Sequence, residues 1–399
     1  MGRIQGSGSL REANTRLVVE QLRHSGPTTR PALARSTGLA KQTVSTIVAR
    51  LMTDGIAREA GIQPAERSGG RPAVLVEYAA DRAYVAGLEI GVGRTRIMLA
   101  DLLGNAVVVQ EVHPEGRSAR RPAEKLVAGL VGELERLLAE RGGLERLHAV
   151  GVSVTGLVHP ASGSCVLAPN LGWRDVPVAG LVSAAIGSDA QVPVIVRGAA
   201  QASLIAEHRE GAAVGEPDVV LVFEDEGVGA AVVEADHLVE GVDGTAGELG
   251  HCAWPGAERR CGCGRRGCVE TLTSGPAVRR EIEARTGRRL PRRPGTPTYA
   301  LLAEQADEPA VAEAVRDAGR VLGTAVSWVT AITAPRLVVL SGSLIAAPDQ
   351  LRAGIVASLR QRALHGGPAR VVPGALGADA ALRGVVLLAL DRARESTAR

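Results

Sequence analysis

Aromatic side chains are scarce: they make up 2% of the 399 residues, with three Trp, three Tyr and one Phe. Proteins that bind single-stranded nucleic acid commonly stack its bases on aromatic rings, so the composition argues against that class of function. Binding to duplex DNA is not affected by this argument. The hydrophobic fraction of 45% must instead build cores from Ala, Val, Leu and Ile, and a chain of this length is expected to form two or three domains.

The sequence also lacks any run of about 18 uncharged apolar residues. Met1 to Leu10 has no apolar core of the kind found in secretion signals. We therefore expect a soluble, cytoplasmic protein with no membrane contact. Cysteine is rare and odd in number, with three of the five between positions 261 and 268, which favours a metal site over a framework of disulfides.

Positive charge is concentrated at the start of the chain. Residues 1–80 hold eleven Lys or Arg and six Asp or Glu, a net charge of +5, whereas the remaining residues have a net charge of −2. We expect this segment to bind a polyanion, because neutralised phosphates supply most non-specific affinity for DNA. The alternative is a solvated surface with a chance imbalance of charge.

The first segment predicts a helix-turn-helix. An amphipathic helix is expected over Asn14 to His24, and a second helix begins after Thr29, a plausible N-cap, and ends at Gly38. A third helix, from about Lys41 to Thr53, places apolar residues on one stripe and small polar or basic residues on the others. This layout is typical of a recognition helix in the major groove. Expected DNA contacts in these two helices are Arg35, Lys41, Gln42, Thr43, Ser45, Thr46 and Arg50.

A wing is expected after these helices. Residues 55–59 and 73–76 can pair as a hairpin whose loop carries Arg67 and, after Gly69-Gly70, Arg71. We hypothesise that Arg71 enters a narrow minor groove, because the flanking glycines let it approach closely. A simple linker turn is the alternative.

The rest of the chain predicts two α/β lobes. Three strands of hairpin type between Tyr84 and Val112 precede a helix over 122–141 and a strand over 147–154, an order typical of an RNase H-like lobe. A second round of strands and helices begins near Val219. We expect a winged helix-turn-helix over residues 1–80, a first lobe over 81–200 and a second over 201–399. A ligand would bind in the cleft between the lobes.

One cluster has the composition of a metal site. His251, Cys261, Cys263 and Cys268 supply one imidazole and three thiolates, a complete tetrahedral shell for Zn²⁺, and intervening glycines let the sulfurs converge. No position is left open for water, so the predicted role is structural. Buried free cysteines are the alternative, and Cys165 and Cys252 are expected to be packing residues.

Two carboxylates flank this cluster. Glu248 and Glu270 are placed to accept hydrogen bonds from vicinal sugar hydroxyls beside a rigid metal knuckle. The alternative is that both are solvated surface residues.

Taken together, these residues resemble the ROK family, which groups sugar-responsive repressors with sugar kinases. The resemblance spans nearly the whole chain and rests on four motifs: residues 33–39 with 43–45, 69–72, 247–251, and 261–270. It implies an actin- or hexokinase-like pair of lobes and a sugar site built from Asn170, Glu248, His251 and Glu270. It also implies assembly as a homodimer or homotetramer.

The sequence departs from the kinase members of the family. Where the resemblance places their Asn-Asp-Ala-Asn segment, this chain has residues 198–201, with Ala199 at the position of the catalytic aspartate. Nothing evident can then deprotonate a sugar hydroxyl, so we expect no phosphoryl transfer. The phosphate loops correspond to residues 89–95 and 225–229, and Asp225 and Glu226 would repel a triphosphate by about 4 kcal/mol for each charge pair at about 4 Å.

The ligand itself is less constrained. Arg197, near the altered wall, would suit a phosphorylated or acidic sugar. The prediction is a DNA-binding repressor controlled by a sugar or sugar phosphate, with double-stranded DNA and a second copy as partners. The competing hypotheses are a ligand-independent regulator with a vestigial sugar site and a sugar kinase.

Overall fold

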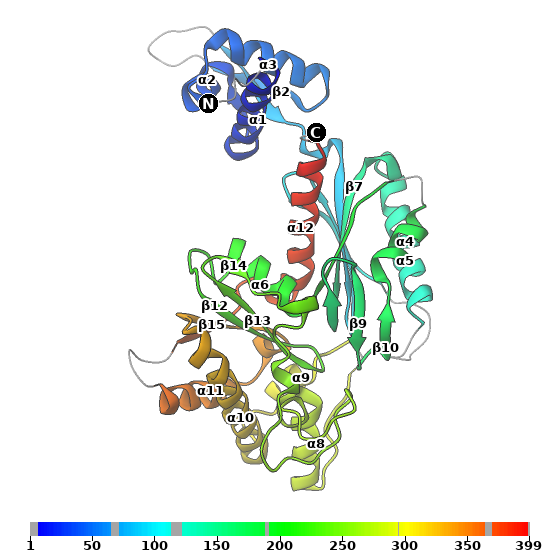
Figure 1. Ribbon diagram of the computed structural model, residues 1–399, viewed down its shortest axis with the longest axis vertical. Coiled ribbons are helices and arrows are strands. Elements are labelled where there is room, and N and C mark those ends of the chain that lie inside the picture. The colour runs from blue at the N-terminus through cyan, green and yellow to red at the C-terminus, as the bar shows by residue number, and fades with distance from the viewer. Residues whose placement is uncertain are drawn as a thin grey trace.

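The computed structural model describes residues 7–64, 72–112, 122–187, 191–293, 295–363 and 369–397. Figure 1 shows a small helical domain at the top, a lobe with one five-stranded sheet below it, and a second lobe with another five-stranded sheet at the bottom. The predicted fold class is confirmed. Among the described residues, no helix is both long and apolar enough to span a membrane.

The N-terminal domain is a winged helix-turn-helix. Its elements are α1 (Ser7–Ser25), β1 (Thr28–Thr29), α2 (Arg30–Thr37), α3 (Lys41–Thr53), β2 (Ala57–Gln63) and β3 (Ala73–Tyr78), with the strands in the order β1-β3-β2. The Thr29 hydroxyl accepts a hydrogen bond from the backbone N–H of Ala32, and Gly38 ends α2 at a φ of 71°, as predicted. The first helix begins well before Asn14. Leu10 is 58% exposed there, so the added turns carry no buried stripe that could have revealed them.

The first lobe is a mixed sheet in the order β11-β7-β4-β5-β6. Its strands are β4 (Tyr84–Ile90), β5 (Thr95–Asp101), β6 (Ala106–Glu111), β7 (Leu147–Val154) and β11 (Val194–Gly198). Helices α4 (Ala123–Ala139) and α5 (Val178–Ile186) share one buried cluster with the sheet, and α12 (Ala380–Thr397) packs on the opposite face. A small sheet of β8 (Leu157–His159), β9 (Ser164–Ala168) and β10 (Trp173–Val176) extends toward the second lobe.

The second lobe has the sheet order β14-β13-β12-β15-β16. Its strands are β12 (Val219–Glu224), β13 (Val228–Glu234), β14 (His237–Leu238), β15 (Leu337–Gly342) and β16 (Arg370–Pro373). One face packs against α8 (Gly275–Thr286), α10 (Pro309–Thr333) and α11 (Asp349–Arg362), and α6 (Ala199–Glu210) covers the other. The short helices α7 (Glu270–Thr273) and α9 (Thr298–Ala303) lie beside α8.

The last helix, α12, contacts the N-terminal domain and both lobes. Although α12 follows the second lobe in sequence, it packs on β4 and β7 of the first lobe and crosses α6. A β-carbon at Gly384 or Gly151 would collide with backbone atoms of α6 or α12, so glycine permits both close approaches. Leu390 and Ala393, near its end, share a core with Val18 of α1. The predicted second lobe, residues 201–399, includes α12, although this helix packs on the sheet of the first lobe. The predicted domain boundaries therefore stay a proposal.

Candidate functional site

Four ligand-type side chains meet at the predicted metal cluster. His251 ends a short helical turn after β14, and the three cysteines come from the loop before α7. The ligand atoms of His251, Cys261, Cys263 and Cys268 all lie within 4.8 Å of one another. Positive φ angles at Gly264 and Gly267, 95° and 72°, fold the loop back so that the sulfurs converge. The arrangement can hold a metal ion.

The other two cysteines lie apart from this cluster. Cys165 is buried in the core of the first lobe, as expected of a packing residue. Cys252 is exposed, so the prediction that it packs in a core is wrong. It directly follows the helical turn that ends at His251, and its backbone there is extended.

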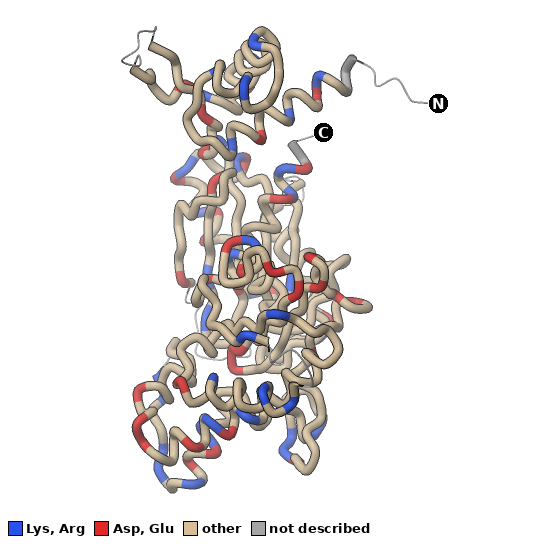
Figure 2. Tube along the Cα trace, turned by 90° about the vertical axis from the view of Figure 1, so that its left-hand side faces the viewer, with Lys and Arg blue, Asp and Glu red and all other residues tan. Residues whose placement is uncertain are grey.

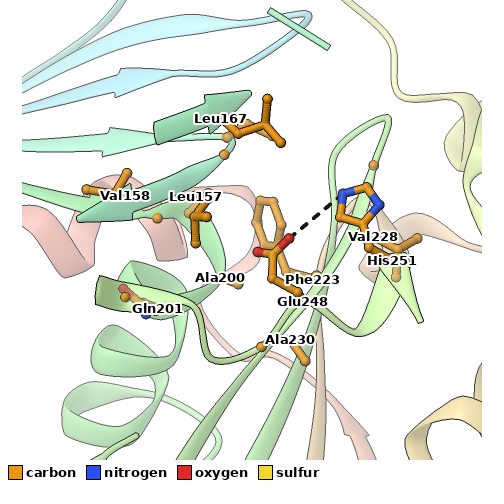
Figure 3. A pocket seen from close by; sticks show the side chains of 18 of the residues that line it. Leu157, Val158, Leu167, Ala200, Gln201, Phe223, Val228, Ala230, Glu248 and His251 are labelled. Carbon is orange, nitrogen blue, oxygen red and sulfur yellow. Dashed lines mark ion pairs between the residues drawn. The ribbon is translucent and has the colours of Figure 1, made fainter. Parts of the chain in front are cut away.

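A cavity of about 100 Å³ lies between the lobes, next to the metal cluster. Its polar side chains include Asn170, Glu248, His251 and Glu270, and the first lobe adds Thr155. The structure thus brings four of the five predicted ligand-binding residues to one cavity, and their roles in binding stay predictions. Figure 3 shows Glu248 and His251 facing each other, with Leu157, Val158 and Leu167 on the strands nearby.

Glu270 belongs to both the cavity and the cluster. Its Oε2 accepts a hydrogen bond of 3.1 Å from the backbone N–H of Val228, and its Oε1 lies 3.4 Å from Sγ of Cys261. The two ring nitrogens of His251 likewise face the cluster and the cavity. Nδ1 lies 3.6 Å from Sγ of Cys261, and Nε2 lies 3.8 Å from the Glu248 carboxylate. The cluster therefore fixes the orientation of two side chains that line the cavity.

Arg197 does not line this cavity. It lies on β11 with its neighbour Val196 buried on the α4 side, and strand alternation turns the guanidinium to the other face. There it forms an ion pair of 3.1 Å with Glu240 and donates to the carbonyl of Val196. The prediction that Arg197 serves an acidic ligand is wrong for this structure.

The rest of the cavity lining is largely apolar. It includes residues that the sequence analysis did not single out: Leu157, Val158, Leu167, Phe223 and Ala230. The start of α6 adds Ala199, Ala200 and Gln201. No sequence motif predicts that Leu157, Val158, Leu167, Phe223 and Ala230 line the cavity. Their positions in it depend on how the small sheet packs against the second lobe.

The segments that the sequence analysis compared with phosphate loops make contacts within the protein. Glu89 and Arg96 are 8% and 7% exposed and form an ion pair of 2.5 Å, and Arg96 also pairs with Asp379. Burial raises the pKa of Glu89, and Arg96 opposes that shift. Glu226, in the turn between β12 and β13, accepts a hydrogen bond of 3.3 Å from Thr298. The acidic side chains of these segments thus bond to other groups of the protein, and their repulsion of a triphosphate stays a prediction.

The N-terminal half of α3 is open to solvent. Lys41, Gln42 and Thr46 are exposed, and Ala40 offers no side chain to cap the helix. Figure 2 shows Lys and Arg positions on the helices at the top of the molecule. Of the predicted DNA contacts, Arg35 and Arg50 are also exposed, and Thr43 and Ser45 are half-buried.

Three of the predicted DNA contacts differ from the rest in their location. Arg67 and Arg71 fall outside the described residues. Arg50 pairs with Asp54 at 3.6 Å and lines a groove between α1, α3 and the end of α12, so it lies toward the body of the protein. The contact roles of all these residues stay predictions.

Fold and site together define a two-lobed sugar-kinase-like protein with a metal knuckle and a winged helix-turn-helix. The model of the ROK family matches residues 85–392, and the chain belongs to this family. It is 29% identical over 276 residues to the xylose repressor of Bacillus subtilis (strain 168), covering 69% of each chain. It is 25% identical over 363 residues to the DNA-binding transcriptional dual regulator NagC of Escherichia coli (strain K12), covering 89% of this chain and 86% of NagC.

Solved structures show the same fold. A ROK family transcriptional regulator, a homolog of the E. coli MLC protein, superposes with a TM-score of 0.74 at 22% identity, covering 98% of each chain. A ROK family glucokinase from Streptomyces griseus, in complex with glucose and AMPPNP, superposes with a TM-score of 0.62 at 24% identity, covering 77% of this chain and all of the glucokinase. The superposition with the regulator includes the N-terminal domain, whereas that with the kinase covers the lobes.

Proposed function

We propose that this chain is a DNA-binding transcriptional repressor whose affinity for its operator is controlled by a sugar that binds in the cavity between the lobes. The observation that carries this proposal is the exposed polar half of α3, a helix of 13 residues, attached to a sugar-kinase-like body. Relatives named as xylose repressor and NagC support it.

The body is proposed to have no kinase activity. Ala199 stands where the kinase members have a catalytic aspartate, and a methyl group cannot take a proton from a sugar hydroxyl. Asp225 and Glu226 lie in the turn between β12 and β13 that the resemblance compares with a phosphate loop, and their charges would oppose the binding of a triphosphate. Kinases among the structural neighbours share the fold, which by itself does not define the activity.

Zinc is the ion proposed for the metal cluster. A tetrahedral site with Zn–S of about 2.3 Å and Zn–N of about 2.0–2.1 Å has edges of about 3.8 Å between sulfurs and about 3.6 Å between sulfur and nitrogen. The separations here are 3.7 Å between Cys263 and Cys268 and 3.6 Å between Cys261 and His251. The ion, when bound, would cross-link the loop before α7 and leave no open position for chemistry.

Helix α12 is proposed to connect the cavity with the winged helix. The segment just before α12, residues 375–379, is bonded to one element of each lobe. Glu207 of α6 accepts hydrogen bonds from the backbone N–H groups of Ala375 and Leu376, and Arg96 of β5 forms an ion pair with Asp379. The last turns of α12 pack beside α1 and Tyr78. A change in the angle between the lobes would therefore move the base of the DNA-binding domain.

A homodimer or homotetramer is proposed as the active form, because one recognition helix seldom supplies enough specificity. On α10, Trp328 is 37% exposed and Ile332 is 85% exposed. Such large apolar side chains suit a contact between copies.

The test is a DNA-binding assay with the purified full-length protein and the DNA upstream of its own gene and its neighbours. We expect protection of discrete duplex sites that sugars release, and no ADP formation from ATP with any hexose. Failure to bind duplex DNA at low salt, together with turnover of ATP, would replace the proposal with a kinase function.

A further inference from the structure

The cavity between the lobes has two chemically different walls. One wall offers hydrogen-bond acceptors and donors: Asn170, Glu248, His251 and Glu270. The apolar wall consists of Leu157, Val158 and Leu167 from the small sheet, labelled in Figure 3, and the two alanines at the start of α6. Phe223 and Thr155 also line the cavity, and the hydroxyl of Thr155 already donates a hydrogen bond of 3.2 Å to Asp225. Gln201 is the one polar side chain that α6 adds, and it is only 6% exposed.

A sugar bound against the polar wall must turn its opposite edge toward the apolar one. A hydroxyl on that edge would lose its hydrogen bonds to water and gain no side-chain partner from the two alanines or the leucines. Such a loss weakens binding by roughly tenfold or more. Replacing the hydroxyl by a methyl group removes that loss and adds roughly a further fourfold from apolar burial.

The charges of the cavity argue against an acidic ligand. Among the described residues that line it, Glu248 and Glu270 are the acidic ones, and His251 is the only one that can carry a positive charge. Both nitrogens of His251 already face partners, the metal cluster on one side and Glu248 on the other. A phosphate or carboxylate in this small space would meet two carboxylates without a free cation to balance it.

We infer that the ligand of this cavity is a neutral sugar with one apolar edge, in which a hydrogen or an alkoxy group replaces a hydroxyl. Deoxysugars and simple alkyl glycosides belong to this class. The inference rests on the proposed sugar response and adds the chemistry of the ligand. Hydroxyls of the polar edge donate to Glu248 and Glu270, and the apolar edge covers Ala199 and Ala200.

Titration calorimetry of the full-length protein tests this inference. The probes are D-glucose, D-galactose and D-mannose, each with its 6-deoxy derivative, its methyl glycoside and its 6-phosphate. For the best-binding hexose, we expect at least one deoxy or alkyl derivative to bind roughly tenfold more tightly than the parent and the phosphate to bind more weakly. Tighter binding of the parent or its phosphate, or no binding of any derivative, overturns the inference.

A substitution in the apolar wall gives a second readout. Ala200→Asn places an amide there and is expected to reduce the preference for the derivative to within about threefold of the parent hexose. Ala284→Asn, an exposed position on α8, is the matched control and keeps the preference. An unchanged preference in Ala200→Asn would also overturn the inference.

Operator binding is measured separately by fluorescence anisotropy without sugar. Loss of DNA binding with an intact sugar preference rejects the proposed function and leaves this inference standing. Normal DNA binding with the wrong sugar preference rejects only the inference.

Discussion

The hydroxyl of Thr155, just after β7 of the first lobe, donates a hydrogen bond of 3.2 Å to Oδ2 of Asp225 in the β12–β13 turn of the second lobe. A β-carbon at Gly91 would stand 2.8 Å from the same oxygen. Burial raises the pKa of Asp225, and a hydrogen bond from the backbone N–H of Val92 opposes that shift. This carboxylate therefore connects the β12–β13 turn of the second lobe with the end of β7 in the first lobe.

The bond between Thr155 and Asp225 should be measurable by a double-mutant cycle. Thr155→Val removes the donor, and we expect a loss of about 1–3 kcal/mol in the free energy of unfolding, most of which disappears when Asp225 is already Ala. Urea unfolding of the four proteins gives the coupling. Thr53→Val, whose hydroxyl bonds only within its own exposed helix, is the control. Additive effects of the two substitutions would contradict the connection.

Metal content should depend on the cluster and on no other cysteine. Cys263→Ser is expected to lower bound zinc from one per chain to near zero and the melting temperature by about 5 °C or more, because metal binding contributes to folding. Elemental analysis and calorimetry measure both. Cys252→Ser, which changes an exposed cysteine outside the cluster, should retain the metal and the melting temperature. Equal metal loss in both variants would exclude the assigned ligand set.

The salt dependence of operator binding should report the contact of Lys41 with phosphate. Lys41→Ala is expected to weaken binding to all DNA sequences and to reduce the slope of log affinity against log salt by about 1. Fluorescence anisotropy over a range of salt concentrations measures the slope. Arg352→Ala, an exposed position on α11 of the second lobe, should leave the slope unchanged. The same slope in Lys41→Ala and the wild type would remove Lys41 from the interface.

Stability should fall with rising pH through the ionisation of Glu224. Burial, with nearby carboxylates, raises its pKa well above the usual value, and it is 2% exposed. The folded state therefore binds the proton more tightly than the unfolded state, and this contribution is lost as pH rises toward the raised pKa. Glu224→Gln keeps an acceptor for the N–H of Gly275 and carries no charge. Its stability relative to the wild type should increase by about 1 kcal/mol or more between pH 5.5 and 8.5, as measured by urea unfolding. A constant difference would contradict this assignment.

The sequence by itself determined the features that depend on local pattern. The helix predicted from about Lys41 to Thr53 is present with these bounds, because its apolar stripe and the turn before it are short-range signals. The metal cluster was predicted because its three cysteines lie within eight residues and glycine allows them to converge. The family likeness rests on similar short motifs.

Tertiary structure decided what depends on long-range approach. Arg197 turns away from the cavity because β11 pairs with β7 and places Glu240 beside it, and no local pattern encodes that neighbour. The apolar wall, the contact between Thr155 and Asp225, and the return of α12 to the first lobe join segments far apart in sequence. Each depends on how two sheets and one helix pack, and packing is set by many weak contacts at once.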